Sequence, residues 1–316
     1  MMALSFDLAL AALLIVAALA AVAGRGLFRA VIFFIVYGVL VALAWARLGA
    51  VDVALAEAAI GAGLTGVLLL AAHGRLRREG QEADPGAGGQ GFAAIGGAGV
   101  ALALGWTWFA LPEPATATRA ALDSALPDAG VGNPVTAVLL NFRSFDTLLE
   151  SIVLLAALVA LWMLARDGAW GERLGLPQHA RPGGVLASFG RVLPPLGLLF
   201  GAFLVWSGAD DNGGAFQGGT VLAASLLLAV MAGLYLPPRI GERLWQSALV
   251  LGPAVFIACG LVGALVWGGF LVLPPAYAKG VILAIETGLT ISIAATLALL
   301  VIGPPEAAES DRDRAA

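Results

Sequence analysis

Four acidic residues lie within, or at the edge of, long apolar stretches of the sequence: Glu57, Asp146, Glu150 and Glu286. A charge near the centre of a bilayer costs about 2.5–3.5 kcal/mol on insertion scales, so such residues usually face a protein interior or a wet path. A carboxyl group in that setting can exchange a proton or help to bind a cation. The four acids therefore indicate proton or ion transfer within a membrane.

Glu57 has the most informative surroundings. Ala54, Ala58 and Gly61 lie on or near its face of the helix expected over Val53–Ala72. Small residues of this kind let another helix approach closely. Two interpretations stay open: Glu57 is a protonated packing residue, or it belongs to a proton or ion path.

Arg143, Asp146 and Glu150 follow each other at spacings of three and four residues. If a helix already runs there, the three share one stripe and Arg143 can pair with Asp146. Asp146 also suits a second interpretation, that of an acid at a favourable helix N-terminus. Glu150 lies deeper in the span, which favours a functional role.

Glu286 lies six residues after Gly280 in the last apolar stretch, and Lys279 precedes it by seven residues on the same helical face. At 1.5 Å per residue, Glu286 is about 9 Å deeper than Gly280. A structural role near the rim and a functional role in the interior both remain open.

The elements that position these acids are membrane helices. Hydrophobic residues make up 60% of the 316, and only 12% are charged, against roughly 25% in soluble domains. A spanning helix needs about 20 mostly apolar residues, which predicts an all-α polytopic membrane protein with about nine spans. These are Leu4–Ala23, Leu27–Ala46, Val53–Ala72, Phe92–Leu111, Leu148–Ala165, Val192–Trp206, Thr220–Leu236, Leu249–Trp267 and Val281–Ile302. A start nearer Val185 stays open for the sixth.

The basic residues predict the orientation of these spans. With the N-terminus outside and the C-terminus inside, the outside segments hold only Arg47, Arg119, Arg143 and Lys279. The other thirteen basic residues fall inside, as the positive-inside rule expects. We interpret the first apolar stretch as a span rather than a signal peptide, because it opens with Asp7 and no basic residue.

Three linkers divide the chain: an inside loop at Gly74–Gly91, a long outside loop at Pro112–Asn141 and an inside loop at Gly168–Gly184. They predict three domains, at residues 1–75, 92–166 and 185–303. A Leu-Pro-Pro sequence recurs at residues 193–195, 236–238 and 273–275. We expect each to mark a helix end, where proline removes no internal hydrogen bond.

Cysteine and histidine are too few for a metal centre or a redox cofactor. The chain has one cysteine, Cys259, and two histidines, His73 and His179, which cannot assemble a zinc site, an iron–sulfur cluster or a haem pair. We therefore expect no catalytic residue, no metal and no cofactor, and any redox chemistry would belong to a partner. The net charge of −4 does not suggest nucleic-acid binding.

Three segments carry a family resemblance. The residues from Asp52 to Gly63, DVALAEAAIGAG, resemble the third helix of MbhD-type proteins, with its D-x-A-x-x-E-A-x-x-G-A-G pattern. Residues 141–150, NFRSFDTLLE, resemble the MbhE-type segment D-F-R-x-F-D-T-x-x-E. The last 130 or so residues resemble the MnhB/MrpB family, through Arg191–Leu196 and then Gly208–Gly219.

The resemblance implies a fused membrane subunit of an Mrp-type Na⁺/H⁺ or other monovalent cation/proton antiporter, and no enzyme. It implies that the partners include a large antiporter-like subunit. It also implies a multi-pass location in the inner (plasma) membrane, with Na⁺ and H⁺ as transported ions. Glu57, Asp146 and Glu150 match family acids on the ion path, and Glu286 falls where many MrpB-like chains have an aspartate. Asp52, Gly61, Gly63 and Arg143 would support them.

The family also implies a π-bulge, because the MbhD-like part is similar to a complex I component whose third helix carries one. Two alternatives stay open beside the antiporter: an ion-translocating coupling subunit of a membrane-bound hydrogenase or complex I-like enzyme, and a passive assembly scaffold. The sequence departs from the family at Asn212, where the family has proline, and at Ala215, where it has glycine. We expect the turn to differ there and to place extra acids outside.

Overall fold

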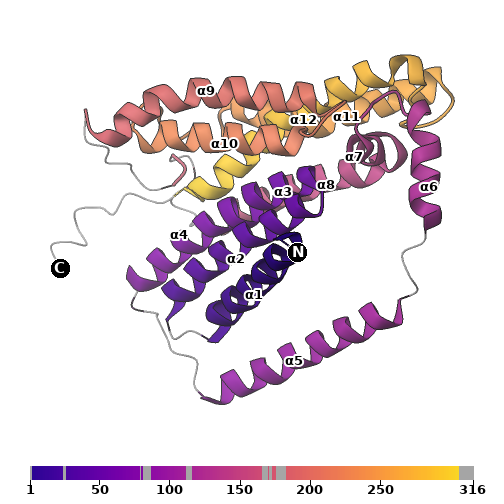
Figure 1. The fold of residues 1–316 in the computed structure, drawn as a ribbon. Helices are drawn as coiled ribbons and strands as arrows, with labels where there is room; N and C mark the ends of the chain where they lie inside the picture. Colours follow the sequence, from indigo (N-terminus) through magenta and orange to yellow (C-terminus); the bar gives the residue numbers. More distant parts are fainter. Residues whose placement is uncertain are drawn as a thin grey trace.

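The computed structural model describes residues 2–23, 26–78, 80, 87–111, 116–165, 170, 173–175 and 183–305. These residues form an all-α protein (Figure 1), as predicted. Its helices are α1 (Met2–Ala23), α2 (Leu27–Arg47), α3 (Val51–Ala56), η1 (Glu57–Leu64), α4 (Thr65–Arg78), α5 (Ala87–Ala110), α6 (Thr116–Ala125), η2 (Leu126–Asp128), α7 (Pro134–Ala137), η3 (Val138–Phe142), α8 (Ser144–Trp162), α9 (Val185–Ser207), α10 (Ala215–Met231), α11 (Arg243–Val266) and α12 (Pro275–Ile302).

Eight helices in the described ranges are long and apolar enough to cross a membrane, which confirms a polytopic membrane protein. The seventh predicted span, Thr220–Leu236, is instead the 17-residue helix α10. It begins earlier, directly after Gly214, and ends earlier, because Gly233 adopts a φ of 71° just beyond its C-terminal cap. Glycine at this position commonly terminates helices.

One Leu-Pro-Pro prediction is wrong. Pro194 and Pro195 lie inside α9, which begins at Val185, the earlier start that the sequence left open. Prolines are tolerated inside membrane helices because neighbouring groups and local adjustments satisfy the freed backbone. The other two Leu-Pro-Pro sequences lie where predicted, between α10 and α11 and at the start of α12.

Two predicted linkers are partly helical. The stretch Pro112–Asn141 contains α6, η2, α7 and part of η3. Asn133 accepts a hydrogen bond from the amide of Val135 at 2.8 Å, and Pro134 follows it at the first helical position; this is a standard way to start a helix. The loop predicted at Gly74–Gly91 is shorter than expected, because α4 continues to Arg78 and α5 begins at Ala87.

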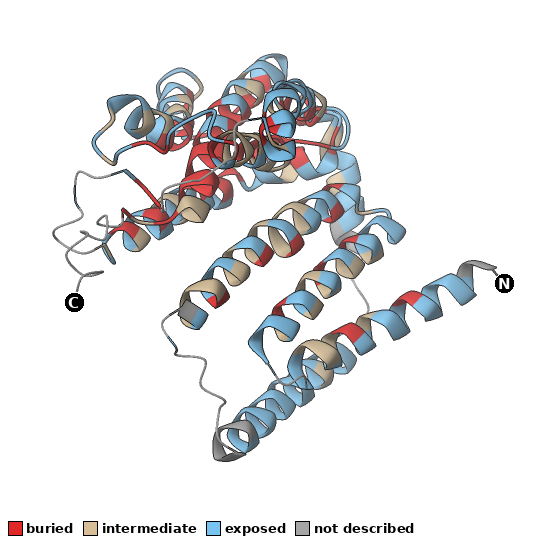
Figure 2. Cartoon of the chain, turned by 90° about the vertical axis from the view of Figure 1, so that its left-hand side faces the viewer, coloured by how far each residue is buried: buried red, intermediate tan, exposed pale blue. Residues whose placement is uncertain are grey.

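The helices form two groups and one outlier (Figures 1 and 2). The first group is α1, α2 and the continuous helix α3–η1–α4, in which α2 packs on all the others. The second is a bundle of α8 to α12, with α12 at its centre. In the most apolar stretch of α12, 67% of the residues are buried. Helix α5 stands apart, with none of its most apolar stretch buried.

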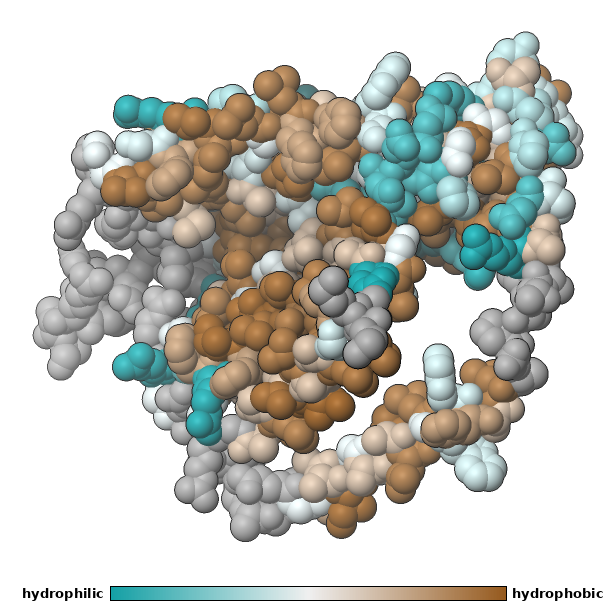
Figure 3. Space-filling model, in the orientation of Figure 1, coloured by the Kyte–Doolittle hydropathy of each residue, from teal (hydrophilic) through white to brown (hydrophobic). Residues whose placement is uncertain are grey.

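Loops that the sequence assigns to one side of the membrane do meet. At one end of the bundle, Leu174 donates a hydrogen bond to the carbonyl of Pro238, and Gly175 donates to that of Pro304. At the opposite end, the amides of Gly132 and Asn133 both donate to the carbonyl of Ala209. We call this second end the acidic end; it holds α6, α7 and a concentration of hydrophilic residues (Figure 3). That it faces the outside stays a prediction.

Candidate functional site

Asp52 is held at a junction between segments that are far apart in the sequence. Its side chain is 7% exposed. One carboxylate oxygen, Oδ1, accepts a hydrogen bond from the amide of Gly213 at 2.7 Å, and the other, Oδ2, accepts from Nδ2 of Asn133 at 3.3 Å. The backbone carbonyl of Asp52 accepts from Nε2 of Gln217 at 3.2 Å. Helix α3, the segment before α7, and the start of α10 are thus joined through one acid.

Glu286 lies on the other side of the same turn. It is 2% exposed, in the middle of α12. The backbone amide of Ala215 hydrogen-bonds to its carboxyl, on which the charge of Asp52 also acts. The second oxygen, Oε2, has no hydrogen-bond partner among the described residues. Glu286 is therefore a buried acid with only half of its carboxyl group satisfied.

The turn between the two acids depends on two glycines. Gly213 and Gly214 adopt φ values of 151° and 127°, in the region that side chains rarely occupy. A Cβ on Gly213 would lie 2.3 Å from the carbonyl oxygen of Leu204, and one on Gly214 would lie 3.2 Å from Oε1 of Glu286. This backbone directs the amide of Gly213 to Asp52 and the amide of Ala215 to Glu286.

A cavity of about 240 Å³ adjoins Asp52 at the acidic end. Its walls come from three parts of the chain: residues 49–53, residues 133–135 and residues 210–212. Asp210 and Asp211 line it together with Asp52. These are the extra acids that the sequence departure predicted in this turn, and they give the cavity a negative lining.

Glu57 opens the π-helix η1, which interrupts the third helix as the resemblance implied. π-Helices are rare and occur frequently at functional sites. A Cβ on Gly61 would lie 2.1 Å from Oε1 of Glu57, so the missing side chain at position 61 leaves room for the carboxyl group. A Cβ on Gly63 would meet only the carbonyl oxygen of Ala58, at 3.2 Å.

The helix expected to carry Arg143, Asp146 and Glu150 on one stripe is interrupted. Arg143 has a φ of −128° between η3 and α8, so α8 begins only at Ser144. The ion pair between Arg143 and Asp146 is present at 2.6 Å, with both side chains more than half exposed. Asp146 thus lies in the first turn of α8, where an acid is favourable. Glu150 is also exposed.

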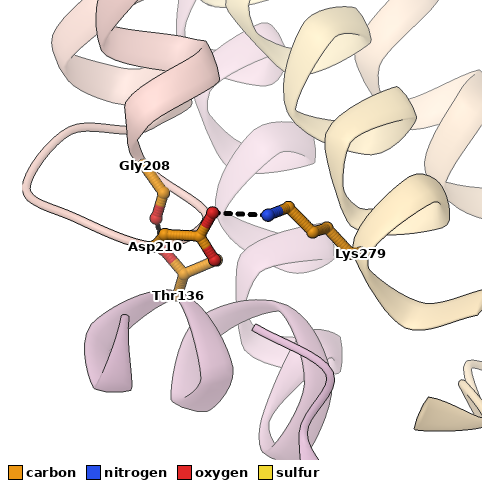
Figure 4. Close-up of polar contacts among 4 residues, drawn as sticks. All are labelled: Thr136, Gly208, Asp210 and Lys279. Carbon is orange, nitrogen blue, oxygen red and sulfur yellow. Dashed lines mark hydrogen bonds and ion pairs between the residues drawn. The ribbon is translucent and has the colours of Figure 1, made fainter. Parts of the chain in front are cut away.

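Lys279 is directed away from Glu286. Its ammonium group pairs with the carboxylate of Asp210, which lies in the turn after α9 (Figure 4). The hydrogen bond from Lys279 holds the pKa of Asp210 below its usual value. Nearby, the hydroxyl of Thr136 on α7 donates to the carbonyl of Gly208 at 2.6 Å. The turn between α9 and α10 is therefore bound to α7 through Thr136 and to α12 through Lys279.

The structure brings together Asp52 and Glu286, Gly61 and Glu57, and Arg143 and Asp146. Sequence reasoning missed Asn133 and Gln217, two uncharged residues that bind Asp52. The Asn-Pro pair before α7 was a signal for a helix start, but nothing local indicates its reach to Asp52. In the described part of the chain, no group of three or more His, Cys, Asp or Glu residues is arranged to hold a metal ion.

Comparison with known families agrees with the three-part organisation of the site. Residues 12–78 match the MbhD family (the D component of MBH), residues 89–177 match MbhE (the E component of MBH), and residues 185–304 match a domain related to the MnhB subunit of Na⁺/H⁺ antiporters. Asp52 lies in the first of these, Asn133 in the second, and Gly213, Gln217 and Glu286 in the third. All three matched segments therefore contribute to the junction.

Individual relatives were found as well. A probable A/B subunit of a K⁺/H⁺ antiporter of Rhizobium meliloti is 27% identical over 55% of this chain and 19% of its own length. An uncharacterized protein of Methanocaldococcus jannaschii is 27% identical over 45% of this chain and 60% of its own length. A chain in the structure of the Mrp complex from Dietzia sp. superposes with a TM-score of 0.74 and 25% identity, over 95% of this chain and 35% of that chain.

The fold and the site define a polytopic membrane protein with buried carboxyl groups at a junction between its segments. The chain carries MbhD, MbhE and MnhB domains in that order, and it is homologous to the A/B subunit of an Mrp antiporter and to a chain of the Mrp complex. It spans about a fifth of the antiporter relative and about a third of the chain of known structure.

Proposed function

We propose that this chain is a membrane subunit of a multisubunit Mrp-type monovalent cation/proton antiporter in the plasma membrane, and not an enzyme. In this proposal Glu57, Asp146, Glu150 and Glu286 contribute to the ion and proton path. Asp52, Gly61, Gly63 and Arg143 support them. The names of the relatives favour Na⁺ or K⁺ together with H⁺ as the transported ions.

The observation that carries the proposal is the π-helix at Glu57. A wide turn that starts at an acid within an apolar span leaves backbone and side-chain groups outside the regular hydrogen-bond pattern. Gly61 leaves room for the carboxyl group. A residue that served packing alone would not require a rare helix form and a glycine beneath its side chain.

Partner subunits are part of the proposal. Large apolar side chains of α5, such as Trp106 and Phe109, are 77% and 89% exposed. Glu150 is an exposed acid within a span, and charged groups in spans usually face protein or water. Both features suit a chain that is surrounded by other subunits, among them a large antiporter-like subunit.

The test is cation-dependent proton flux in vesicles that contain the whole purified complex. Glu57→Gln keeps the shape of the side chain but cannot ionise, and we expect it to abolish flux while the complex still assembles. Glu57→Asp keeps the acid with a shorter reach and should retain part of the flux. Normal flux in Glu57→Gln would show that Glu57 is only a packing residue.

A glycine pair provides a matched control. Gly61→Ala places a methyl group where the Glu57 carboxyl lies, so it should reduce flux. Gly74→Ala, in the continuation of the same helix, meets nothing within 4 Å and should leave flux unchanged. Equal effects of the two substitutions would attribute the loss to the helix as a whole.

A second candidate function rests on the names of the two N-terminal families, both of which are subunits of MBH. In that case the chain moves ions in a redox-coupled complex whose partners hold the redox centres. The two functions differ in their energy source. Flux that requires an electron donor, and that a cation gradient alone cannot drive, would establish the redox-coupled complex.

A further inference from the structure

The proposed function places Glu286 on the path and Asp52 in support of it, but it does not say how the two acids act together at their junction. Each acid receives hydrogen bonds from the protein, but the two sets of bonds differ. Both oxygens of Asp52 accept hydrogen bonds, from Gly213 and from Asn133. Carboxylates that accept several such bonds are stabilised in the ionised form. Asp52 is therefore the member of the pair whose two carboxylate oxygens both have hydrogen-bond partners.

Glu286 has the opposite environment. It is 2% exposed, no basic side chain contacts it in the described structure, and its Oε2 has no acceptor or donor. A buried charge without a counter-charge is far more costly than a neutral carboxyl group. The negative charge of Asp52 also acts on it, which disfavours a second negative charge. Glu286 is therefore the member that holds the proton.

Glu57 follows Asp52 by five residues on the continuous helix α3–η1–α4, and it is only partly buried. The other helices described around the pair carry few titratable groups. Helix α10 contains no acidic or basic residue, and the titratable groups of α11 are Arg243 at its start and Cys259. Arg191 of α9 lies near the opposite end of the bundle. The acids of α8, Asp146 and Glu150, are exposed. At the acidic end, Lys279 forms an ion pair with Asp210, and Asp211 is exposed in the same turn.

Gln217 lies beside both acids. Its Nε2 donates a hydrogen bond to the backbone carbonyl of Asp52. Its Oε1 and the Oε1 of Glu286 lie 3.3 Å and 3.2 Å from the position that a Cβ on Gly214 would occupy. Asp52 in turn lines the 240 Å³ cavity at the acidic end. From buried to open, the order is Glu286, the Gly213–Gly214 turn with Gln217, Asp52 and the cavity.

We propose that Asp52 and Glu286 hold one proton between them, and that this proton exchanges with water of the cavity through Asp52. In the exchange the O–H bond at Glu286 breaks and one forms at Asp52, so the pair keeps a single negative charge until Asp52 releases the proton to water. This deepens the proposed function, on which it rests: it gives the path an access point between the MbhD and MnhB domains, separate from Glu57.

The first test does not depend on transport. Infrared spectra of the purified whole complex should show a protonated-carboxyl band that Glu286→Gln removes. Asp123→Asn is the control, because Asp123 is an exposed acid at the same end of the molecule, on α6. An unchanged band in Glu286→Gln would overturn the proposal, since Glu286 would then hold no proton.

The second test addresses the sharing. Asp52→Asn removes the negative neighbour with which the proton is shared, while Glu286 stays buried, so we expect the Glu286 band to shift in frequency. Asp211→Asn, a substitution in the adjacent turn, should leave it unchanged. An Asp52→Asn spectrum identical to that of the unmodified protein would show that the two acids are independent and would overturn the pair.

The third test addresses access. Val135 lines the cavity and is 37% exposed. In a Cys259→Ser background, a bulky impermeant thiol reagent on Val135→Cys should slow deuterium exchange of the Glu286 band. Unslowed exchange after complete labelling would overturn access through the cavity.

The outcomes separate this inference from the proposed function. A Glu286 band that depends on Asp52, in a complex without antiport, supports the pair and contradicts the function. Antiport that Glu57→Gln abolishes, with no Glu286 band, supports the function and contradicts the pair.

Discussion

Helices α5 and α12 are both long, apolar and rich in small residues, yet they occupy opposite environments. Of the most apolar stretch of α12, 67% is buried, while none of that of α5 is (Figure 2). A Cβ added to Gly288 of α12 would meet Val255 at 3.3 Å, whereas one added to Gly96, Gly97 or Gly99 of α5 would meet nothing. Apolar composition predicts a membrane helix in both cases. Whether the helix is buried depends on the helices that pack against it.

The same contrast separates the two regions that hold acids. Glu286 lies in the closely packed bundle, where a protein environment surrounds it completely. Glu57 lies in the N-terminal group, where it is only partly buried and where α1, α2 and α4 expose much of their surface. The bundle therefore encloses its acid within this chain, whereas the N-terminal group leaves its acid partly exposed. Two predictions test this contrast in packing, and a third concerns the exposed ion pair at the acidic end.

The largest effect is expected for Phe256→Ala, because Phe256 is 0% exposed in the bundle core. In a bilayer or detergent the apolar transfer term largely cancels, so the lost packing dominates. A cavity on the order of 100 Å³ at about 24 cal/mol per Å³ costs about 2 kcal/mol. Unfolding of the purified chain in detergent would measure this loss.

Trp106→Ala on α5 is the matched control for Phe256→Ala. Trp106 is 77% exposed, so its removal should change the stability of the chain very little. A loss as large as that in Phe256→Ala would mean that α5 packs against the rest of this chain, and the contrast would then fail.

A smaller change in stability is expected for glycine-to-alanine substitutions, and it should differ in sign between α10 and α5. A Cβ on Gly219 of α10 would lie 2.8 Å from Cγ2 of Ile293 on α12, and overpacking of this kind costs about 1–3 kcal/mol. The better helix propensity of alanine, up to about 1 kcal/mol, offsets part of that cost. Gly219→Ala should therefore be net destabilising.

Gly99→Ala on α5 receives the same propensity gain with nothing within 4 Å to oppose it. It should be neutral or slightly stabilising. The two variants are compared by thermal unfolding in the same detergent. The same sign for both would show that close approach of α10 and α12 contributes less than the structure indicates.

The smallest effect concerns pH. The pKa of Asp210 is lowered, mainly by its hydrogen bond with Lys279, so the pair stabilises the fold above the unfolded pKa of about 3.9 and the contribution is lost as pH falls through the folded pKa. Both side chains are more than half exposed. We expect the lower end of the roughly 0.2–1 kcal/mol typical of exposed pairs.

Asp210→Asn should therefore reduce stability near pH 7 and converge with the unmodified protein below about pH 4. The measurement is unfolding as a function of pH at low salt, since salt screens exposed pairs. Asp211→Asn is the control, because Asp211 is the adjacent exposed acid and its side chain makes none of these contacts. A difference that persists at low pH would assign the effect to the turn rather than to the ion pair.

The sequence by itself determined the class of the protein. The length and apolarity of the stretches predict the membrane helices, because a bilayer selects helices by local composition. The ionisable residues within those stretches marked Glu57, Glu150 and Glu286. The motif from Asp52 to Gly63 carried the resemblance to a family in which the third helix has a π-bulge, and the structure contains a π-helix that starts at Glu57. Each of these predictions depends on residues near each other in the chain.

Other features required the tertiary structure. Asp52 and Gly213 are 161 residues apart, and nothing near Asp52 in the sequence indicates a partner there. Lys279 shares a helical face with Glu286, but it pairs with Asp210 in another loop. Pro194 and Pro195 lie inside α9 and not at its end. Membrane helices can contain proline because surrounding groups can satisfy the freed backbone carbonyls.

The physical reason lies in the range of the interactions. Whether a stretch enters the membrane depends on the free energy of transferring its own residues from water to the bilayer, which can be summed from the sequence. Which acids meet depends on how helices pack and on turns such as Gly213–Gly214, whose positive φ values aim two backbone amides in different directions. The chain therefore specifies its acids locally, and the fold decides that Asp52 and Glu286 bind backbone amides of the same turn.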